Sequence, residues 1–221
     1  QVTKENILKL REKLMNSTVN DKVIISVNGH GLLSDSLDFY YDTYDCDFKS
    51  PVTRGLKYED LEALLDGIPA RKKLLLIDAC HSGALDKEEL VAQQKKGAAT
   101  EKEAVAKSDT VKGFASRGTI LRNTQSKIDA NSTYEVMQNL FADLSSGNGA
   151  VIISAAGGME YAFESDKWNN GVFTYCIRRG IEEELADKQD GNGDNLVNVD
   201  ELKKYVSRKV SELTGGKQRP V

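Results

Sequence analysis

The sequence predicts an α/β fold in which helices flank a mostly parallel central sheet. Three short apolar runs without alternation, at residues 23–27, 74–77 and 150–156, have the pattern of strands that are buried on both faces. Amphipathic segments of helical length separate these runs along the chain. Because helix followed by parallel strand is the repeating unit of α/β proteins, this order favours one sheet with helices on both sides.

Composition narrows the class of protein further. The 221 residues suffice for one domain with a sizeable core and hardly for two, so we expect a single domain over residues 1–221. A net charge of −4 argues against nucleic-acid and anionic-membrane partners, and no apolar run approaches the roughly 20 residues of a membrane span. Three cysteines, an odd and sparse set, indicate reduced thiols in a cytoplasm-like compartment. Cys46 and Cys176 are interpreted as structural.

The first predicted helix spans Thr3 to Met15, with Thr3 as a possible cap, and leads into the strand at 23–27. No earlier strand is predicted, so this strand is expected to have an open edge that a missing amino-terminal segment or a further domain would cover. Residues 34–47 interleave five aspartates with aromatic side chains. That pattern fits a polar hairpin with an aromatic inner face, an acidic rim for a basic substrate, or a cation site.

The remaining elements follow in order along the chain. A helix at 58–65 ends before Gly67 and Pro69 and leads into the strand at 74–77. Residues 86–131 lack a sustained apolar period, and so long an irregular segment is either functional or a plain solvated insertion. Further elements are predicted as a helix at 134–144, the strand at 150–156, and helices at 172–187 and 201–213.

Reactive side chains follow two of the predicted strands. Cys80 follows the run at 74–77, and His30 lies between two glycines just past the run at 23–27. Open α/β folds place their chemistry at the carboxyl ends of parallel strands. An imidazole close by can convert a thiol to a thiolate near neutral pH, so we predict Cys80 as a nucleophile and His30 as its base. The alternative is a cysteine that only packs in the core.

The residues around these two side chains form two motifs, Asn28-Gly29-His30-Gly31 and Asp78-Ala79-Cys80-His81-Ser82-Gly83, with 50 residues from His30 to Cys80. The pair resembles the caspase-like peptidases, specifically the prokaryotic orthocaspases and metacaspases. The resemblance implies a caspase-like sandwich, here without its first strands and its last strand. It also implies a large-subunit-like part at 1–85, a small-subunit-like part at 132–221, and self-cleavage in the linker at 86–131.

The resemblance also implies a mechanism. In such cysteine endopeptidases the thiol of Cys80 would attack the scissile carbonyl, while His30 would move the proton. The backbone N–H groups of Gly31 and Cys80 would form the oxyanion hole. His81, next to the nucleophile, is expected to serve structure, and no organic cofactor is expected.

Specificity is predicted from the acid two residues before the nucleophile. Asp78 is an acid as in metacaspases and clostripain-like enzymes, so the resemblance implies cleavage after Arg or Lys in protein or peptide substrates. Asn28, Ser154 and Glu160 are the predicted walls of the pocket. Self-cleavage at a basic residue of the linker would follow from the same preference.

A second motif lies near the end of the chain and predicts calcium. The loop 190–201 places oxygen donors at EF-hand positions 1, 3, 5, 7, 9 and 12, flanked by helices. These positions are Asp190, Asn192, Asp194, Leu196, Asn198 and Glu201. Position 6, usually glycine, is Asn195, which tolerates a positive φ better than most residues. The alternative is a polar turn between two helices.

Two further functions compete with an Arg- or Lys-specific peptidase. The chain could be a catalytically silent caspase-like domain that binds calcium and a partner protein. It could also be a caspase-like enzyme that cleaves after aspartate. The complete His30 and Cys80 motifs argue against the first alternative, and Asp78 argues against the second.

Overall fold

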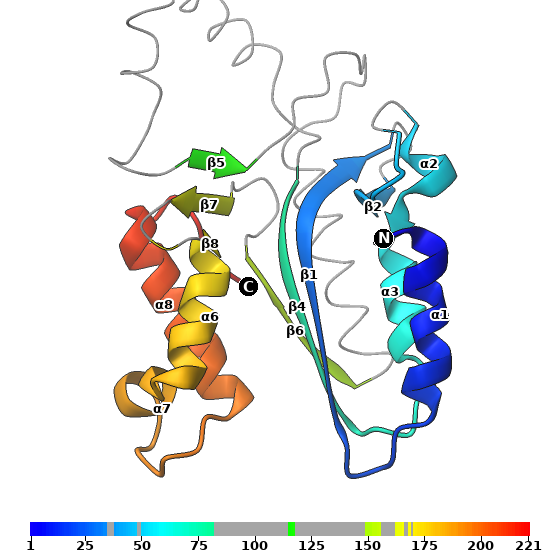
Figure 1. Ribbon diagram of the computed structural model, residues 1–221. Coiled ribbons are helices and arrows are strands. Elements are labelled where there is room, and N and C mark those ends of the chain that lie inside the picture. Colours follow the sequence, from blue (N-terminus) through cyan, green and yellow to red (C-terminus); the bar gives the residue numbers. More distant parts are fainter. Residues whose placement is uncertain are drawn as a thin grey trace, which may run out of the picture.

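A five-stranded sheet with the order β3-β2-β1-β4-β6 forms the centre of the molecule (Figure 1). The computed structural model describes residues 1–34, 38–47, 50–81, 115–117, 149–155, 162–165, 168 and 170–221. Strands β1, β4 and β6 are parallel, and β2 and β3 continue the sheet as antiparallel strands. The strands are β1 (Lys22–Leu33), β2 (Phe39–Tyr41), β3 (Leu56–Lys57), β4 (Lys72–His81) and β6 (Ala150–Ser154).

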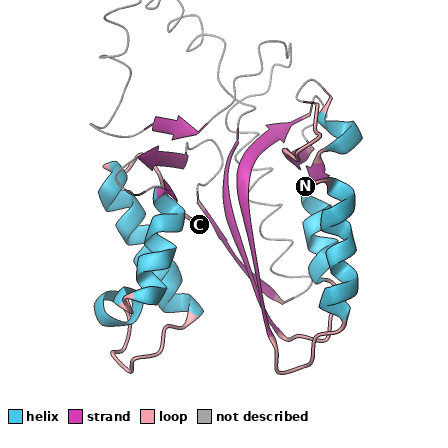
Figure 2. Cartoon of the chain, in the orientation of Figure 1, coloured by secondary structure: helices cyan, strands magenta, loops and turns pink. Residues whose placement is uncertain are grey.

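Helices cover both faces of this sheet, as the cyan elements of Figure 2 show. The first face carries α1 (Lys4–Met15) and α3 (Tyr58–Leu65). The short helix α2 (Pro51–Arg54) comes between these two helices in the chain. The second face carries α6 (Val172–Glu182) and α8 (Val199–Thr214), with α7 (Leu185–Asp190) between them in the chain. The predicted α/β class and the flanking helices are confirmed.

Strand β4 divides the core into two layers because successive side chains point to opposite faces. Its odd-numbered residues, among them Leu75 and Ile77, pack with α1 and α3. Its even-numbered residues Leu74 and Leu76 pack with α6 and α8. The unalternating apolar run of β4 is therefore explained by burial on both faces.

Local signals placed several elements correctly. Helix α1 starts after Thr3, whose Oγ1 accepts a hydrogen bond from the backbone N–H of Asn6 at 3.3 Å, so the predicted cap is confirmed. Helix α3 has the predicted bounds. The helix predicted at 172–187 is wrong in its extent, because Glu184 adopts a left-handed conformation with φ of 55° and separates α6 from α7.

Strands β1 and β4 are longer than predicted. The two motifs predicted to be catalytic begin inside the strands, since β1 continues to Leu33 and β4 to His81. An open edge was predicted for β1, and β2 covers only the end of it, because β2 pairs with residues 31–33 and no described strand pairs with residues 22–30 on that side. Pairing with β4 as far as Gly31, and with β2 from Gly31 to Leu33, extends β1 past its apolar run, and the aromatic side chains of β2 are buried there.

A smaller three-stranded sheet contains β5 (Ala115–Arg117), β7 (Ala162–Ser165) and β8 (Asn170–Gly171) in the order β5-β7-β8. Strand β5 belongs to the segment 86–131, so that segment is not irregular throughout. It pairs antiparallel with β7. The other residues of 86–131 and the helix predicted at 134–144 lie outside the described residues.

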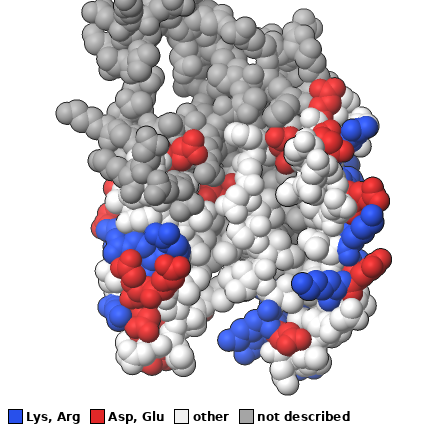
Figure 3. Space-filling model, in the orientation of Figure 1, with Lys and Arg blue, Asp and Glu red and all other residues white. Residues whose placement is uncertain are grey.

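Charges of both signs interleave on the outer surface of the helices (Figure 3). Ion pairs one helical turn apart account for part of this pattern, Lys9 with Glu5 on α1 and Arg179 with Glu183 on α6. Such pairs are typical of helix surfaces that are exposed to solvent. Within the described part of the chain, every helix is too short or too polar to cross a bilayer.

Candidate active site

The parallel pairing of β1 with β4 brings the two predicted reactive residues together. His30 is the register partner of Cys80, and Asn28 is the register partner of Asp78. Residues 28–31 and 78–81 are remote in the sequence, yet they pair at the carboxyl ends of the neighbouring strands β1 and β4 (Figure 1). This is the position at which open α/β sheets bind and transform ligands.

The even-numbered positions of β1 and β4 belong to the face that α6 covers. Val23, Ile25 and Val27 pack on the opposite face with α1 and α3. By alternation, Asn28 and His30 lie on the α6 face, as does Asp78. His30 is half-buried there, whereas Asp78 is almost fully buried, with 2% of its surface exposed.

A threonine of α6 joins the two predicted pocket residues. Thr174 Oγ1 lies 2.5 Å from Asp78 Oδ2 and 3.1 Å from Asn28 Oδ1. Asn28 Nδ2 in turn donates to Ser26 Oγ at 3.1 Å. Sequence reasoning missed Thr174, because no local pattern links a threonine of the first turn of α6 to strands β1 and β4.

The proton of the Thr174 hydroxyl can be donated to one acceptor at a time, and the shorter contact assigns it to Asp78. Asn28 then satisfies the network when its amide group is flipped from the orientation with Nδ2 toward Ser26 Oγ, so that its NH2 group donates to Thr174 Oγ1 and its carbonyl accepts from the Ser26 hydroxyl. In that arrangement the hydrogen bonds all run in one direction: Ser26 donates to Asn28, Asn28 donates to Thr174, and Thr174 donates to Asp78. The Thr174 hydroxyl therefore orients the carboxylate of Asp78.

Replacing Thr174 by valine is expected to lower the free energy of unfolding by about 1–3 kcal/mol, because the buried carboxylate of Asp78 loses a donor. Thr174→Ser keeps the hydroxyl and should retain most of the stability. Urea unfolding of the three proteins at neutral pH measures the difference. Equal stability of the valine and serine variants would show that the hydroxyl does not support Asp78.

A carboxylate also lies beside His30, on the side away from Cys80. The backbone N–H of Asp42, which follows β2, donates to the carbonyl oxygen of His30 at 2.8 Å. Burial raises the pKa of the Asp42 carboxyl, and the neighbouring His30 opposes this rise. Asp42 was one of five similar aspartates in the sequence and was not singled out.

The structure places the other predicted site residues as follows. Gly31 lies inside β1, where its register partners are His81 of β4 and Tyr41 of β2, so the predicted oxyanion donor belongs to a strand. Ser154 ends β6 and is buried, and its backbone N–H and carbonyl pair with Val221 at 2.8 and 3.1 Å. Glu160 lies outside the described residues.

Gln218 contacts residues on both sides of the segment that contains Glu160, and no sequence pattern indicated this role of Gln218. Its Nε2 donates to the carbonyl of Ala155, and its Oε1 accepts from the N–H of Phe163, both at 2.8 Å. The side chain is fully buried. One glutamine therefore joins the described residues Ala155 and Phe163.

The other two cysteines differ from a nucleophile in their surroundings. Cys176 is fully buried in α6, and burial raises the pKa of its thiol to about 12. Burial also raises the pKa of the half-buried Cys46. Both side chains are free thiols that stay protonated near neutral pH.

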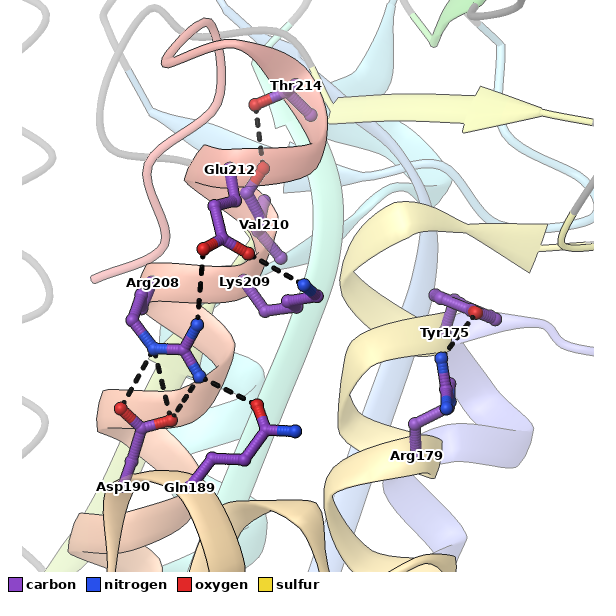
Figure 4. A network of polar contacts seen from close by, with 9 residues as sticks. All are labelled: Tyr175, Arg179, Gln189, Asp190, Arg208, Lys209, Val210, Glu212 and Thr214. Atoms are coloured by element: carbon purple, nitrogen blue, oxygen red, sulfur yellow. Dashed lines mark hydrogen bonds and ion pairs between the residues drawn. The ribbon is translucent and has the colours of Figure 1, made fainter.

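The loop predicted to bind calcium is held by contacts within the protein. The guanidinium of Arg208 lies against the Asp190 carboxylate with N–O distances of 2.9, 3.2 and 2.6 Å (Figure 4). The buried Asp187 carboxylate accepts from the backbone N–H groups of Gly193, Asp194 and Asn195. Asn195 has the positive φ, 65°, that position 6 of the loop requires.

This donor set does not fit calcium in the arrangement described. Asp190, the first predicted ligand, is engaged by Arg208, and Glu201, the last, caps α8 by accepting from the N–H groups of Asn192 and Asn198. Across the described residues, no three His, Cys, Asp or Glu side chains gather closely enough to hold a metal ion. Calcium binding therefore stays a prediction.

Comparison with known families agrees with the geometry of β1 and β4. The profile of the caspase domain of peptidase family C14 matches residues 1–221. The chain belongs to the caspase-domain family. Members of this family are cysteine peptidases, so protein or peptide substrates are implied.

Comparison of folds is consistent with this assignment. A protein of Geobacter sulfurreducens with a known crystal structure is similar over 100% of this chain and 72% of its own, with a TM-score of 0.53 and 16% sequence identity. At that identity the similarity concerns the fold alone. A search of curated proteins gave no match.

Proposed function

We propose that this caspase-domain protein is a cysteine endopeptidase that cleaves after Arg or Lys with a His30–Cys80 dyad. The main support is the register of β1 with β4, which pairs the two residues directly. Family membership supports the reaction class, and the buried Asp78 supports the preference for a basic residue. The two free thiols among the described residues, Cys46 and Cys176, fit the reducing, cytoplasm-like compartment that we also propose.

In the proposed reaction the Cys80 thiol gives its proton to His30 and its sulfur attacks the scissile carbonyl carbon. The tetrahedral intermediate collapses with loss of the C–N bond, and the imidazolium returns the proton to the leaving amine. Water then attacks the thioester, again with His30 as base, which releases the carboxylic acid and restores the thiol. Backbone N–H groups, with Gly31 and Cys80 proposed, would stabilise the oxyanion.

Asp78 is proposed to recognise the basic side chain at the cleavage site. A buried carboxylate binds a guanidinium or ammonium group strongly and leaves an acidic or apolar side chain without compensation. Thr174 orients this carboxylate, and Asn28 contacts the same Thr174 hydroxyl. Ser154 and Glu160 are proposed as further pocket residues.

Two fluorogenic peptides that end in Arg or in Asp, assayed with and without calcium, test this function. The proposal expects hydrolysis of the Arg peptide only. Mass spectrometry of the purified chain tests self-processing, since fragments should start just after a basic residue of 86–131. Hydrolysis of the Asp peptide alone would indicate an aspartate-specific enzyme, and no hydrolysis or self-cleavage would favour a silent interaction domain.

Calcium is proposed as a ligand of the loop 190–201 only in a state in which Asp190 has left Arg208. Arg208→Met is therefore expected to tighten calcium binding by about tenfold, because hydrogen bonds to charged groups contribute about 1.5–3 kcal/mol and 1.4 kcal/mol corresponds to tenfold. Isothermal titration calorimetry measures the affinity. Arg178→Met removes the same charge from an exposed pair with Glu182 and serves as the control. Absence of binding in all three proteins would exclude a calcium site here.

A further inference from the structure

The sheet places a third polar residue in line with the proposed dyad. The antiparallel register of β1 with β2 pairs Gly31 with Tyr41 and Leu32 with Tyr40. Continued by one residue, it sets Asp42 opposite His30, and the 2.8 Å hydrogen bond from Asp42 N–H to the His30 carbonyl shows that the pairing does continue. Asp42, His30 and Cys80 thus form one row across β2, β1 and β4.

Alternation puts the side chains of Asp42 and His30 on the same face of the sheet. Phe39 and Tyr41 of β2 pack on the face of α1 and α3, so the even-numbered Asp42 points to the α6 face. His30 lies on that face as well. Directly opposite residues of antiparallel strands have Cβ atoms about 4.5–5.5 Å apart, which is within reach of a carboxylate and an imidazole.

Each of these side chains has a buried polar atom that needs a partner. Among the described residues, neither Nδ1 of His30 nor Oδ1 of Asp42 has a hydrogen-bond partner, and both atoms are inaccessible to solvent. A buried polar atom without a partner is costly, so two of them on facing side chains require an explanation. A bond from the N–H of Nδ1 to the carboxylate would satisfy both.

We infer that Asp42 is the positioning residue of His30, accepting the Nδ1 proton so that Nε2 faces the thiol of Cys80 as the base. The inference rests on the proposed peptidase function. A carboxylate in this place holds the imidazole in one tautomer and stabilises the imidazolium that forms when the thiol ionises. Among the described residues of the acidic stretch 34–47, the register of β2 on β1 sets only Asp42 opposite His30.

The stability of the fold offers a way to separate this role from a structural one. Burial raises the pKa of Asp42, so between its ordinary and its raised pKa the folded chain holds a proton that the unfolded chain releases. The free energy of unfolding therefore falls as the pH rises through that window, and the loss persists above it. Asp42→Asn removes the charge, so at pH 7.5 or so it should leave the melting temperature equal or higher.

Asp42→Asn is the decisive variant, because a carboxamide can donate to Nδ1 and so favour the wrong tautomer. We expect kcat to fall on the order of 100-fold, within the range of general acid–base contributions, with KM little changed. Asp45→Asn, in the same stretch and paired with Arg54 at 3.5 Å, removes the same charge and should keep the parent kcat.

Nitrogen-15 NMR tests the contact without activity. In full-length protein that carries Cys80→Ala to prevent self-cleavage, the signals of His30 should report a protonated Nδ1, and Asp42→Asn should shift them to the other tautomer. The chain has only two histidines, so His30→Asn assigns the signals. An inactive parent would contradict the proposed peptidase but would leave this readout valid.

Two results would overturn the inference. One is a His30 tautomer that does not change in Asp42→Asn. The other is a melting temperature that drops in Asp42→Asn together with a kcat within twofold of the parent, since that pattern belongs to a residue that only supports the fold.

Discussion

Replacing Cys80 by alanine is expected to abolish hydrolysis of the Arg peptide, with a loss of at least 10⁴-fold in kcat. Removing the nucleophile of a peptidase leaves only the contribution of substrate binding and oxyanion stabilisation, and a loss near 10⁶-fold is known for a serine nucleophile. His30→Ala should cause a similar loss, because nucleophile and base act as one unit. Initial rates with a fluorogenic Arg peptide measure both effects.

Cys46→Ala is the matched control, since Cys46 is the more exposed of the two free thiols described. It should retain the parent rate, and its thiol stays protonated because burial raises the pKa. Circular dichroism and the melting temperature establish that each variant is folded. Hydrolysis that survives in folded Cys80→Ala and disappears in Cys46→Ala would identify Cys46 as the nucleophile and contradict the proposed mechanism.

Replacing Asp78 by asparagine is expected to lower kcat/KM for the Arg peptide by about 10²- to 10³-fold. Removing one partner of a buried charge pair costs about 2–5 kcal/mol. The carboxamide oxygen can still accept from Thr174 Oγ1, so the hydrogen bond of 2.5 Å to α6 has a replacement and the fold should persist. Steady-state kinetics with peptides that end in Arg and in citrulline measure the effect.

Citrulline is the informative partner because it has the shape of arginine without the charge. If Asp78 recognises the positive charge of arginine, the parent protein prefers the Arg peptide strongly. Asp78→Asn then brings the kcat/KM values for the Arg and citrulline peptides close together. A uniform loss on both peptides would instead indicate damage to the neighbouring dyad. An unchanged preference for Arg in Asp78→Asn would place the specificity pocket elsewhere.

The main elements of the fold were predictable because their signals are local. The apolar runs of β1, β4 and β6 and the cap at Thr3 depend on residues close in the chain, and each was found by its pattern. Strand ends were less predictable. Residues 28–33 of β1 have no apolar run, and they are a strand because β4 pairs with residues 28–31 and β2 pairs with residues 31–33.

The residues of the candidate site were likewise predictable only where their signal is local. The positions of His30 and Cys80 were found from two local motifs, and the sheet pairs them. Thr174 could not be found, since it lies 146 residues from Asn28 and 96 from Asp78 along the chain. The EF-hand pattern of 190–201 was plain in the sequence, but the pattern contains no sign that Arg208 of α8 would engage Asp190.

The amino-acid sequence by itself determined the class of the fold, the family and the two motifs, because each is written in neighbouring residues. Only the tertiary structure decided which side chains meet these motifs. Five aspartates of the stretch 34–47 are equivalent in sequence, and the register of β2 on β1 selects Asp42 as the one opposite His30. The physical reason is that strand register and helix packing are set by hydrogen bonds and burial summed over the whole sheet, which no short stretch of residues contains.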